Sequence, residues 1–342
     1  SAEKPVLGLP SGSVGGWKEL ARTTLGSAGD DITVTSLADK RYYMVLCDIQ
    51  QVTSNIRSAT RLNADTGSNY ATRDSENGGS DSTATSGSYI KNSGSLVSPM
   101  FNVQYLSNLS TKEKLMLSHN VGQNTAGASA APTRMEAVGK WANTSNAIST
   151  IAQYNDQGGS YNTNSEVVVL GWDPADTHTS NFWEELASVD LSGGTADTLS
   201  TGTFTAKKYL WIQYFAKSIT GLTQARITFN SDTGSNYARR QEVNGSAGSG
   251  TSLSNIDVWN DDMTAGTTGF LNLFMINNSA TDKLGIGNTN QQLGSGAATA
   301  PQRREAVIKW ANTSSQITEV TLTNTTAGTL DTPTTLKVWG SD

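Results

Sequence analysis

Cysteine and histidine are scarce in this chain of 342 residues, and their scarcity excludes several kinds of site. The one cysteine, Cys47, cannot form an internal disulfide, and its place in the apolar run YYMVLCDI predicts a buried thiol. The two histidines, His119 and His178, are not neighbours in the sequence, so we expect no zinc site with His and Cys ligands. The sequence also has no P-loop and no dinucleotide-binding fingerprint. We therefore expect no cofactor.

Charge and long apolar runs are equally sparse. The 24 Lys and Arg residues are outnumbered by 30 Asp and Glu residues. A nucleic-acid groove needs clustered positive charge to neutralise phosphates, so nucleic acid is not an expected partner. No apolar run of 18 residues occurs, so no membrane span is expected. The 33 glycines, together with abundant Thr, Ser and Asn, favour short strands joined by turns over long helices.

An internal repeat organises the whole sequence. Four pairs of segments match: WKELA (17–21) with WEELA (183–187), DTGSNYA (65–71) with its identical copy (232–238), PTRMEAVGKWANTS (132–145) with PQRREAVIKWANTS (301–314), and VVVLGWD (167–173) with LKVWGSD (336–342). The offset between the members of a pair changes only from 166 to 169 residues. The chain is therefore two copies of one module of about 155 residues.

The repeat also predicts the domain organisation. We expect a flexible N-terminal arm at 1–16, a first module at 17–172, a linker at 173–181 and a second module at 182–342. Each module contains about eight short apolar or alternating runs, separated by Gly, Asn and Asp. Only the W-x-E-L-A segments could be helical, and they are too short to stand alone. The pattern predicts an all-β fold of two tandem, jelly-roll-like β-sandwich domains; an immunoglobulin-like sandwich is disfavoured because its Cys–Trp–Cys spacing is missing.

One motif, Asn-x-Asp-Thr-Gly-Ser-Asn-Tyr, stands once in each module. Its Asp-Thr-Gly-Ser part is also the outline of pepsin-like aspartic proteases, in which each lobe gives one Asp to a buried pair. The flanks here are polar, so we expect a strand-connecting turn and no catalytic residue. Calcium binding by the loop oxygens is an alternative interpretation. The duplicated turn comprises Asn63, Asp65, Gly67 and Asn69 in the first copy, and Asn230, Asp232, Gly234 and Asn236 in the second.

A second motif, P-x-R-x-E-A-V-x-K-W-A-N-T-S, predicts a strand with one charged and one mostly apolar face. Period-two alternation places the charged side chains in a row on one side: Arg134, Glu136 and Lys140 in the first copy, and Arg303, Glu305 and Lys309 in the second. Such a row is either a solvated surface with weak ion pairs or a surface that meets a neighbouring subunit. Tryptophans also recur, Trp17 with Trp183 and Trp141 with Trp310, which favours core positions over sugar stacking.

Taken together, these segments resemble a known family. The sequence W-x-E-L-A followed by GDDITV, KRYYMVL, RLNADTGSNYATR, KEKLMLSH, APTRMEAVGKWANTS and SEVVVLGWD is similar to a jelly-roll module of virion structural proteins from phages and related prokaryotic viruses. The resemblance covers nearly all of both copies. It implies a location in the virion, self-association, and contacts with other virion proteins. It brings no catalytic residues.

The resemblance leaves two roles open. Tandem jelly rolls resemble the double-jelly-roll capsid proteins, which implies a capsid shell built from pseudo-sixfold trimers of two-domain subunits. The arm at 1–16 would then contact a neighbouring subunit. The alternative is a receptor-binding or decoration protein, in which two lectin-like modules bind a surface glycan with avidity. A cellular surface-layer or adhesive protein is a third interpretation.

Overall fold

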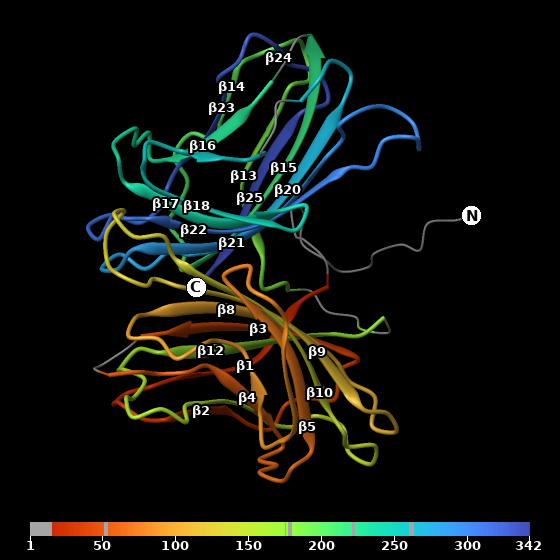
Figure 1. The fold of residues 1–342 in the computed structure, drawn as a ribbon, viewed down its shortest axis with the longest axis vertical. Helices are drawn as coiled ribbons and strands as arrows, with labels where there is room; N and C mark the ends of the chain where they lie inside the picture. Colours follow the sequence, from red (N-terminus) through yellow and green to blue (C-terminus); the bar gives the residue numbers. More distant parts are fainter. Residues whose placement is uncertain (1–15, 51–53, 175, 177–179, 221–222, 260–262) are drawn as a thin grey trace. The chain divides into compact units, whose positions relative to one another are not determined.

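The chain is built from β-strands in every described regular element of its computed structural model (Figure 1). The structure describes residues 16–342 except 51–53, 175, 177–179, 221–222 and 260–262. Of the predicted arm at 1–16 only Gly16 is described, and part of the predicted linker at 173–181 also lies outside the described residues.

Two compact units divide the chain. The first comprises Ser1–Gly122 and Met135–Glu184, and the second comprises Gln123–Arg134 and Glu185–Asp342. Residues 123–134 thus belong by their contacts to the second unit, although the repeat places them in the first module. The predicted module boundaries, 17–172 and 182–342, stay a prediction.

The first copy forms two antiparallel sheets. The larger sheet has the strand order β1 (Lys18–Thr24), β12 (Glu166–Trp172), β3 (Tyr42–Ile49), β8 (Met100–Ser107), β9 (Lys114–Gly122), β10 (Thr133–Trp141), β5 (Tyr70–Glu76) and β6 (Ser82–Gly87). The smaller sheet has the order β2 (Asp31–Val34), β11 (Ile151–Tyr154), β4 (Ala59–Leu62) and β7 (Ile90–Lys91).

The order in which these strands change sheet is that of a jelly roll. In an eight-stranded jelly roll, the first, eighth, third and sixth strands lie side by side in one sheet, and the second, seventh, fourth and fifth in the other. The small sheet has the first arrangement, with β2 as the first strand, β11 as the eighth, β4 as the third and β7 as the sixth. In the large sheet β3, β5 and β6 take their expected places, while the meander β8-β9-β10 replaces the seventh strand, and β1 and β12 extend the sheet. The predicted fold class is confirmed.

The second copy repeats this topology. Its large sheet has the order β13 (Glu184–Asp190), β25 (Thr335–Ser341), β15 (Tyr209–Thr220), β20 (Thr268–Ile276), β21 (Lys283–Gln291), β22 (Gln302–Trp310), β17 (Tyr237–Val243) and β18 (Ser246–Leu253), with β24 (Thr329–Leu330) also paired to β15. Its small sheet has the order β14 (Thr198–Ser200), β23 (Val320–Asn324), β16 (Ala225–Phe229) and β19 (Ile256–Asp257).

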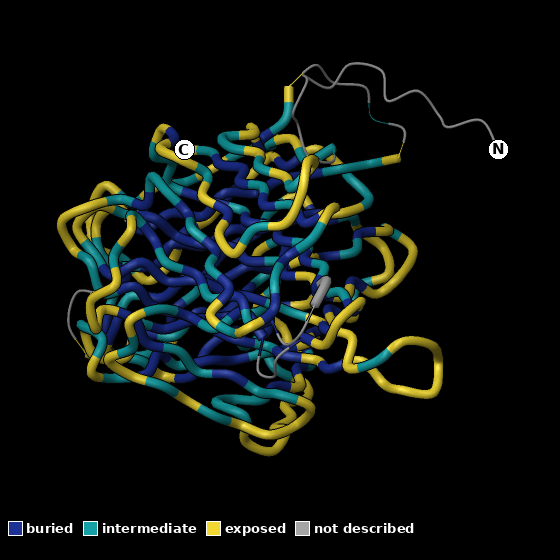
Figure 2. The backbone as a smooth tube through the Cα atoms, turned by 90° about the horizontal axis from the view of Figure 1, so that it is seen from above, coloured by how far each residue is buried: buried dark blue, intermediate teal, exposed yellow. Residues whose placement is uncertain are grey.

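Each unit has its own apolar core between its two sheets. The first is built around residues such as Val45, Ile151 and Trp141, and the second around Ile212, Leu322 and Trp310. The buried residues gather in the interior, and most of the exposed residues lie in loops at the outside (Figure 2). Period-two alternation between core and outer face therefore determines which side chain is available for binding.

Two features of the strands differ from expectation. The W-x-E-L-A segments are extended: β1 pairs with β12, and β13 with β25, because the last strand of each copy offers a free backbone edge. The hairpin strands β6 and β18 are not among the apolar or alternating runs that indicate strands in the sequence. Most of their side chains are exposed, so they lack the apolar alternation by which a strand is recognised in a sequence.

Candidate functional site

The duplicated motif forms a tight turn that carries the chain from the small sheet to the large one. Asn63 and Ala64 have φ angles of 52° and 53°, and Asp65 N donates to Leu62 O at 3.0 Å. Positive φ at both central residues defines a type I′ turn. In the second copy Asn230 and Ser231 have φ angles of 51° and 54°. The structure therefore places this motif in a strand-connecting turn in both copies.

The Asp of each turn binds groups of its own unit. Asp65 accepts hydrogen bonds from Gly67 N (2.8 Å), Asn69 Nδ2 (2.9 Å) and Trp141 Nε1 (2.7 Å). The ring of Tyr70 stacks on Trp141 with centroids 6.4 Å apart. Asp232 makes the same contacts with Gly234 N (2.8 Å), Asn236 Nδ2 (2.9 Å) and Trp310 Nε1 (2.8 Å).

These contacts argue against both alternatives for the motif. In a catalytic carboxylate pair one proton is shared, so one of the two pKa values is raised. Here burial tends to raise the pKa of Asp65, but hydrogen bonds from Trp141, Asn69 and Gly67 outweigh it and lower the pKa. The same holds for the pKa of Asp232. Calcium would have to displace these donors, and no group of three His, Cys, Asp or Glu residues in the described part of the chain could hold a metal ion.

A buried lysine completes the arrangement, and sequence reasoning missed it. Lys114 is 1% exposed, donates to Asn143 O at 2.8 Å and lies 5.3 Å from the ring centroid of Trp141. We call Asp65, Tyr70, Lys114 and Trp141 the first clasp, and Asp232, Tyr237, Lys283 and Trp310 the second clasp. Burial lowers the pKa of Lys283 to about 8, against a smaller opposite effect of Asp282. The recurrence of Lys before both Leu115 and Leu284 was the available signal.

The clasps predict how stability depends on pH. A lowered folded-state pKa stabilises the fold above the unfolded-state pKa of about 3.9, and this stabilisation is lost as the pH falls through the folded-state value. We therefore expect the double variant Asp65→Asn, Asp232→Asn to be less stable than the native protein at pH 7, and the difference to shrink towards pH 3. Urea unfolding at both pH values measures it. A difference that is constant with pH would contradict the assigned hydrogen bonds.

The charged row lies as the alternation predicts in the first copy. Met135, Ala137 and Trp141 face the core, whereas Val138 and Lys140 are exposed. Lys140 forms an ion pair with Glu113 at 3.1 Å, with 45% and 42% of the two side chains exposed. Glu136, of intermediate exposure, lies between Arg134 and Lys140 in the row. This part of the row is a surface.

The rest of the row is engaged within the second unit. Arg134, 1% exposed, contacts Glu242 at 2.9 Å and Glu305 at 3.7 Å. Arg303 contacts the same two carboxylates at 2.8 Å and 3.7 Å. Lys309 is fully buried, and burial lowers its pKa. In the second copy Lys309 is therefore removed from solvent, whereas Arg303 stays exposed and Glu305 is half-buried.

An open apolar hollow of about 880 Å³ lies on the outer face of the large sheet of the first unit. Its floor includes Leu115, Leu117 and Val138, which are 57%, 55% and 48% exposed. These side chains come from β9 and β10, on the face opposite the core. Large apolar surfaces that remain open on a soluble domain mark sites where something binds. Sequence reasoning grouped Val138 with the charged row and missed this surface.

Aromatic side chains line the other end of the hollow. Tyr42 stacks on Trp172 with centroids 5.5 Å apart, and Trp17 lies 6.5 Å from Tyr105. Trp17, which was predicted to be a core residue, is half-buried, whereas Trp141, Trp183 and Trp310 are buried. The hollow thus combines an aliphatic floor with an aromatic rim.

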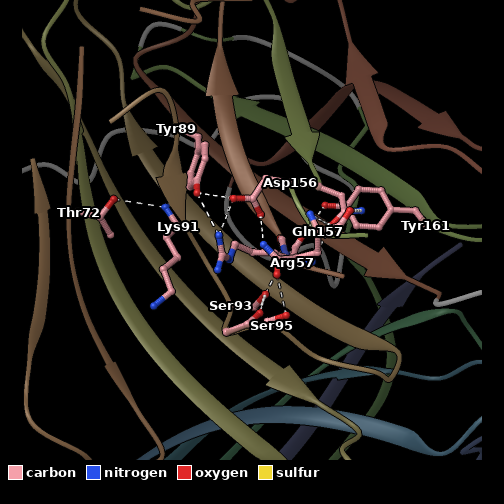
Figure 3. Close-up of polar contacts among 12 residues, drawn as sticks. Arg57, Thr72, Tyr89, Lys91, Ser93, Ser95, Asp156, Gln157 and Tyr161 are labelled. Carbon is pink, nitrogen blue, oxygen red and sulfur yellow. Dashed lines mark hydrogen bonds and ion pairs between the residues drawn. The ribbon is translucent and has the colours of Figure 1, made fainter. Parts of the chain in front are cut away.

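A polar cluster lies beside the small sheet, where Asp156 follows β11 and Arg57 precedes β4 (Figure 3). Asp156 accepts hydrogen bonds from Arg57, Tyr89 and Gln157, each at 2.6 Å. Burial alone would raise the pKa of Asp156, but these hydrogen bonds and the Arg57 charge lower it. The carboxylate is already bound by its neighbours, so the cluster stabilises the loop rather than offering a reactive group.

Comparisons with known proteins add little. No family model and no curated protein matches the chain. Domains LG4-5 of the mouse laminin alpha1 chain align over 95% of this chain and 90% of that chain, with 9% identity and a TM-score of 0.17. So low a TM-score carries no argument. None of the described residues form a helix able to span a membrane.

Proposed function

We propose that this chain is a non-enzymatic structural protein of a viral particle, located in the virion, that builds the capsid shell by self-association as a pseudo-sixfold trimer of two-domain subunits. The open apolar hollow on a duplicated jelly roll carries this proposal. Covering such a surface releases water and stabilises association by roughly 25 cal/mol per Å² of apolar area buried. Two domains of one topology in a single chain suit repeated, symmetric contacts.

The described geometry offers little for catalysis. The duplicated Asp residues are bound within their turns, and Cys47 is buried, which raises its pKa well above the ordinary value. A thiol in this state is a poor nucleophile. A structural role through contact surfaces therefore explains more of the described features than a catalytic role does.

Self-association gives the first test. We expect the purified protein to form species of three times the 36.2 kDa subunit mass, and larger closed particles at higher concentration. Light scattering after size-exclusion chromatography and electron microscopy would measure both. A protein that stays monomeric at every concentration would contradict the proposal.

The aromatic rim favours one alternative, a virion-surface or decoration protein that binds a carbohydrate. Aromatic faces stack on sugar rings, and Tyr42 and Tyr105 are each 37% exposed at the hollow. On this alternative the monomer binds a glycan array, and Tyr42→Ala weakens binding without changing the mass in solution. A monomer that binds glycans would replace the capsid proposal.

A further inference from the structure

Residues 123–134, here called the linking segment, are held in the second unit by a lysine and an aspartate. Lys309 Nζ, which is fully buried, donates to Gln123 O at 3.0 Å and to Thr125 O at 2.6 Å. Asp282, 3% exposed, accepts from Gln123 Nε2 at 2.9 Å. The buried ammonium group of Lys309 thus binds two backbone carbonyls of the segment, and the Asp282 carboxylate accepts from its first side chain. We call the residues of the second unit that bind the segment its seat.

Further hydrogen bonds hold the rest of the linking segment. They join backbone atoms of the segment to the second unit: Gly127 N to Asp282 Oδ2 (2.9 Å), Ser252 N to Ala128 O (2.8 Å), and Arg240 Nε to Pro132 O (2.8 Å). At the end of the segment Arg134 pairs with Glu242. The groups that the segment itself contributes to these bonds are mostly backbone groups. The seat therefore recognises the backbone path of the segment more than its side chains.

The first unit has a corresponding set of residues, and there they are exposed. The seat comprises Lys309, Asp282, Arg240 and Ser252, and the repeat aligns these with Lys140, Glu113, Arg73 and Ser86, which have like chemistry. All four counterparts are exposed. Ser86 and Ser252 share a positive φ, 53° and 49°, so the backbone at this point has the same shape in both copies.

The apolar surroundings differ between the copies in the same way. Leu284, Ile286 and Val307 of the second copy are 2–4% exposed. Their counterparts by the repeat are Leu115, Leu117 and Val138, the exposed floor of the hollow. Arg73 and Lys140 also line the hollow. The hollow is therefore the open counterpart of a surface that is buried in the second copy.

A second linking segment is present in the chain and is mostly exposed. Residues 292–303, QLGSGAATAPQR, align with 123–134, QNTAGASAAPTR, and share Gln, Gly, Ala, Ala, Pro and Arg at matching places. Gly127 and Gly296 have φ angles of 82° and 77°, so the two segments bend alike. Pro132 is buried, whereas its counterpart Pro301 is exposed.

We propose that residues 292–303 of one copy of this chain bind in the hollow of the first unit of a second copy, where Lys140 and Glu113 take the roles that Lys309 and Asp282 have within the chain. The contact joins two different surfaces, so it is heterologous and adds copies head to tail, which forms a ring such as the proposed trimer when the rotation closes. This inference rests on the proposed self-association and names the surface responsible for it.

Exchanging the segment tests the inference in the full chain. Replacing residues 292–301 by a Gly/Ser sequence of equal length should abolish association, whereas replacing them by the chain's own QNTAGASAAP (123–132) should retain it. Both changes lie in an exposed stretch, so circular dichroism and thermal unfolding should match the native protein. Sedimentation velocity over a range of concentrations measures the association.

Charge reversal tests the seat. Lys140→Glu should raise the dissociation constant of the oligomer by about tenfold or more. The matched control is Lys337→Glu, because Lys337 is also a strand lysine, with a side chain that is 40% exposed and one carboxylate partner, Glu185 at 3.3 Å. If the native protein associates and the Gly/Ser and Lys140→Glu variants associate equally well, the inference is wrong while self-association stands. A native protein that never associates would overturn both, including the case in which the hollow binds only glycans.

Discussion

Replacing Trp141 by alanine is expected to lower the free energy of unfolding of the first unit by about 4 kcal/mol. The indole is 1% exposed, stacks on Tyr70 and lies beneath the ammonium group of Lys114. Its removal leaves a cavity, takes one donor from Asp65 and leaves a buried lysine beside empty space. Trp310→Ala should act alike in the second unit, because Trp310 is fully buried and makes the corresponding contacts. Urea unfolding followed by far-ultraviolet circular dichroism measures both.

The variant Trp141→Phe separates packing from hydrogen bonding. Phenylalanine keeps most of the buried ring but has no N–H group, so Asp65 Oδ2 loses the donor now at 2.7 Å. We expect a loss of about 1–3 kcal/mol, clearly smaller than that of the alanine variant. Equal losses for Phe and Ala would show that the hydrogen bond dominates, and a loss below about 1 kcal/mol for Ala would mean that the clasp is not part of the folding core.

What the sequence could predict depended on short-range pattern. The turn at Asp65 and Asp232 and the alternation along β10 follow from residues close together in the chain, and the duplication follows from matching short segments 166 to 169 residues apart. Turn formation uses the φ preference of Asn and the ability of Asp to bind its own backbone, which are local properties. The expectation of a jelly roll rested on the number and spacing of the strand-like runs, which do not by themselves determine the strand order.

The polar interior of the first unit could not be predicted in this way. Thr60, Gln104 and Gln153 are fully buried, and Gln153 Nε2 donates to Thr60 Oγ1 at 3.0 Å. At the corresponding positions the second copy has Ile227, Leu273 and Leu322. A single Gln in a strand predicts an exposed position. Gln104 is stable in the core because it bonds to Thr60, Cys47 and Gln153 on three other strands.

The hollow was missed for the opposite reason. Leu115, Leu117 and Val138 satisfy the strand pattern of a buried face, and in the second copy the corresponding side chains are indeed buried. Whether such a face is covered depends on what lies over it, which alternation along one strand does not determine. Only comparison of the two folded copies separates a covered surface from an open one.

Replacing Arg304 by methionine is expected to stabilise the second unit by about 1–3 kcal/mol. Arg304 faces the core and is 2% exposed, and its guanidinium Nη1 donates to Asp257 O at 2.6 Å. Its Nε and Nη2 have no hydrogen-bond partner among the described residues. Burial, and then the like charge of Arg239, lower the pKa of Arg304 to about 9, against the opposite effect of Asp257. At neutral pH the folded state therefore disfavours the charge that this side chain carries.

The first copy shows that methionine fits this position. The repeat aligns Arg304 with Met135, which is also 2% exposed and faces the first core. Asp257 keeps an ion pair with Arg226 at 3.0 Å and another with Arg239, so removing Arg304 leaves no unpaired carboxylate. Urea unfolding at pH 7 measures the gain, and the free energy of unfolding should rise.

The reciprocal variant, Met135→Arg, should destabilise the first unit by about 3 kcal/mol or more, because it buries a guanidinium charge where the native protein has an apolar side chain. The opposite signs of the two variants distinguish this account from a general tolerance of the site. If Arg304→Met were instead destabilising by a similar amount, the hydrogen bond to Asp257 O would outweigh the burial of the guanidinium. Arg304 would then be a structural anchor of the short strand β19 rather than a buried charge that the second unit tolerates.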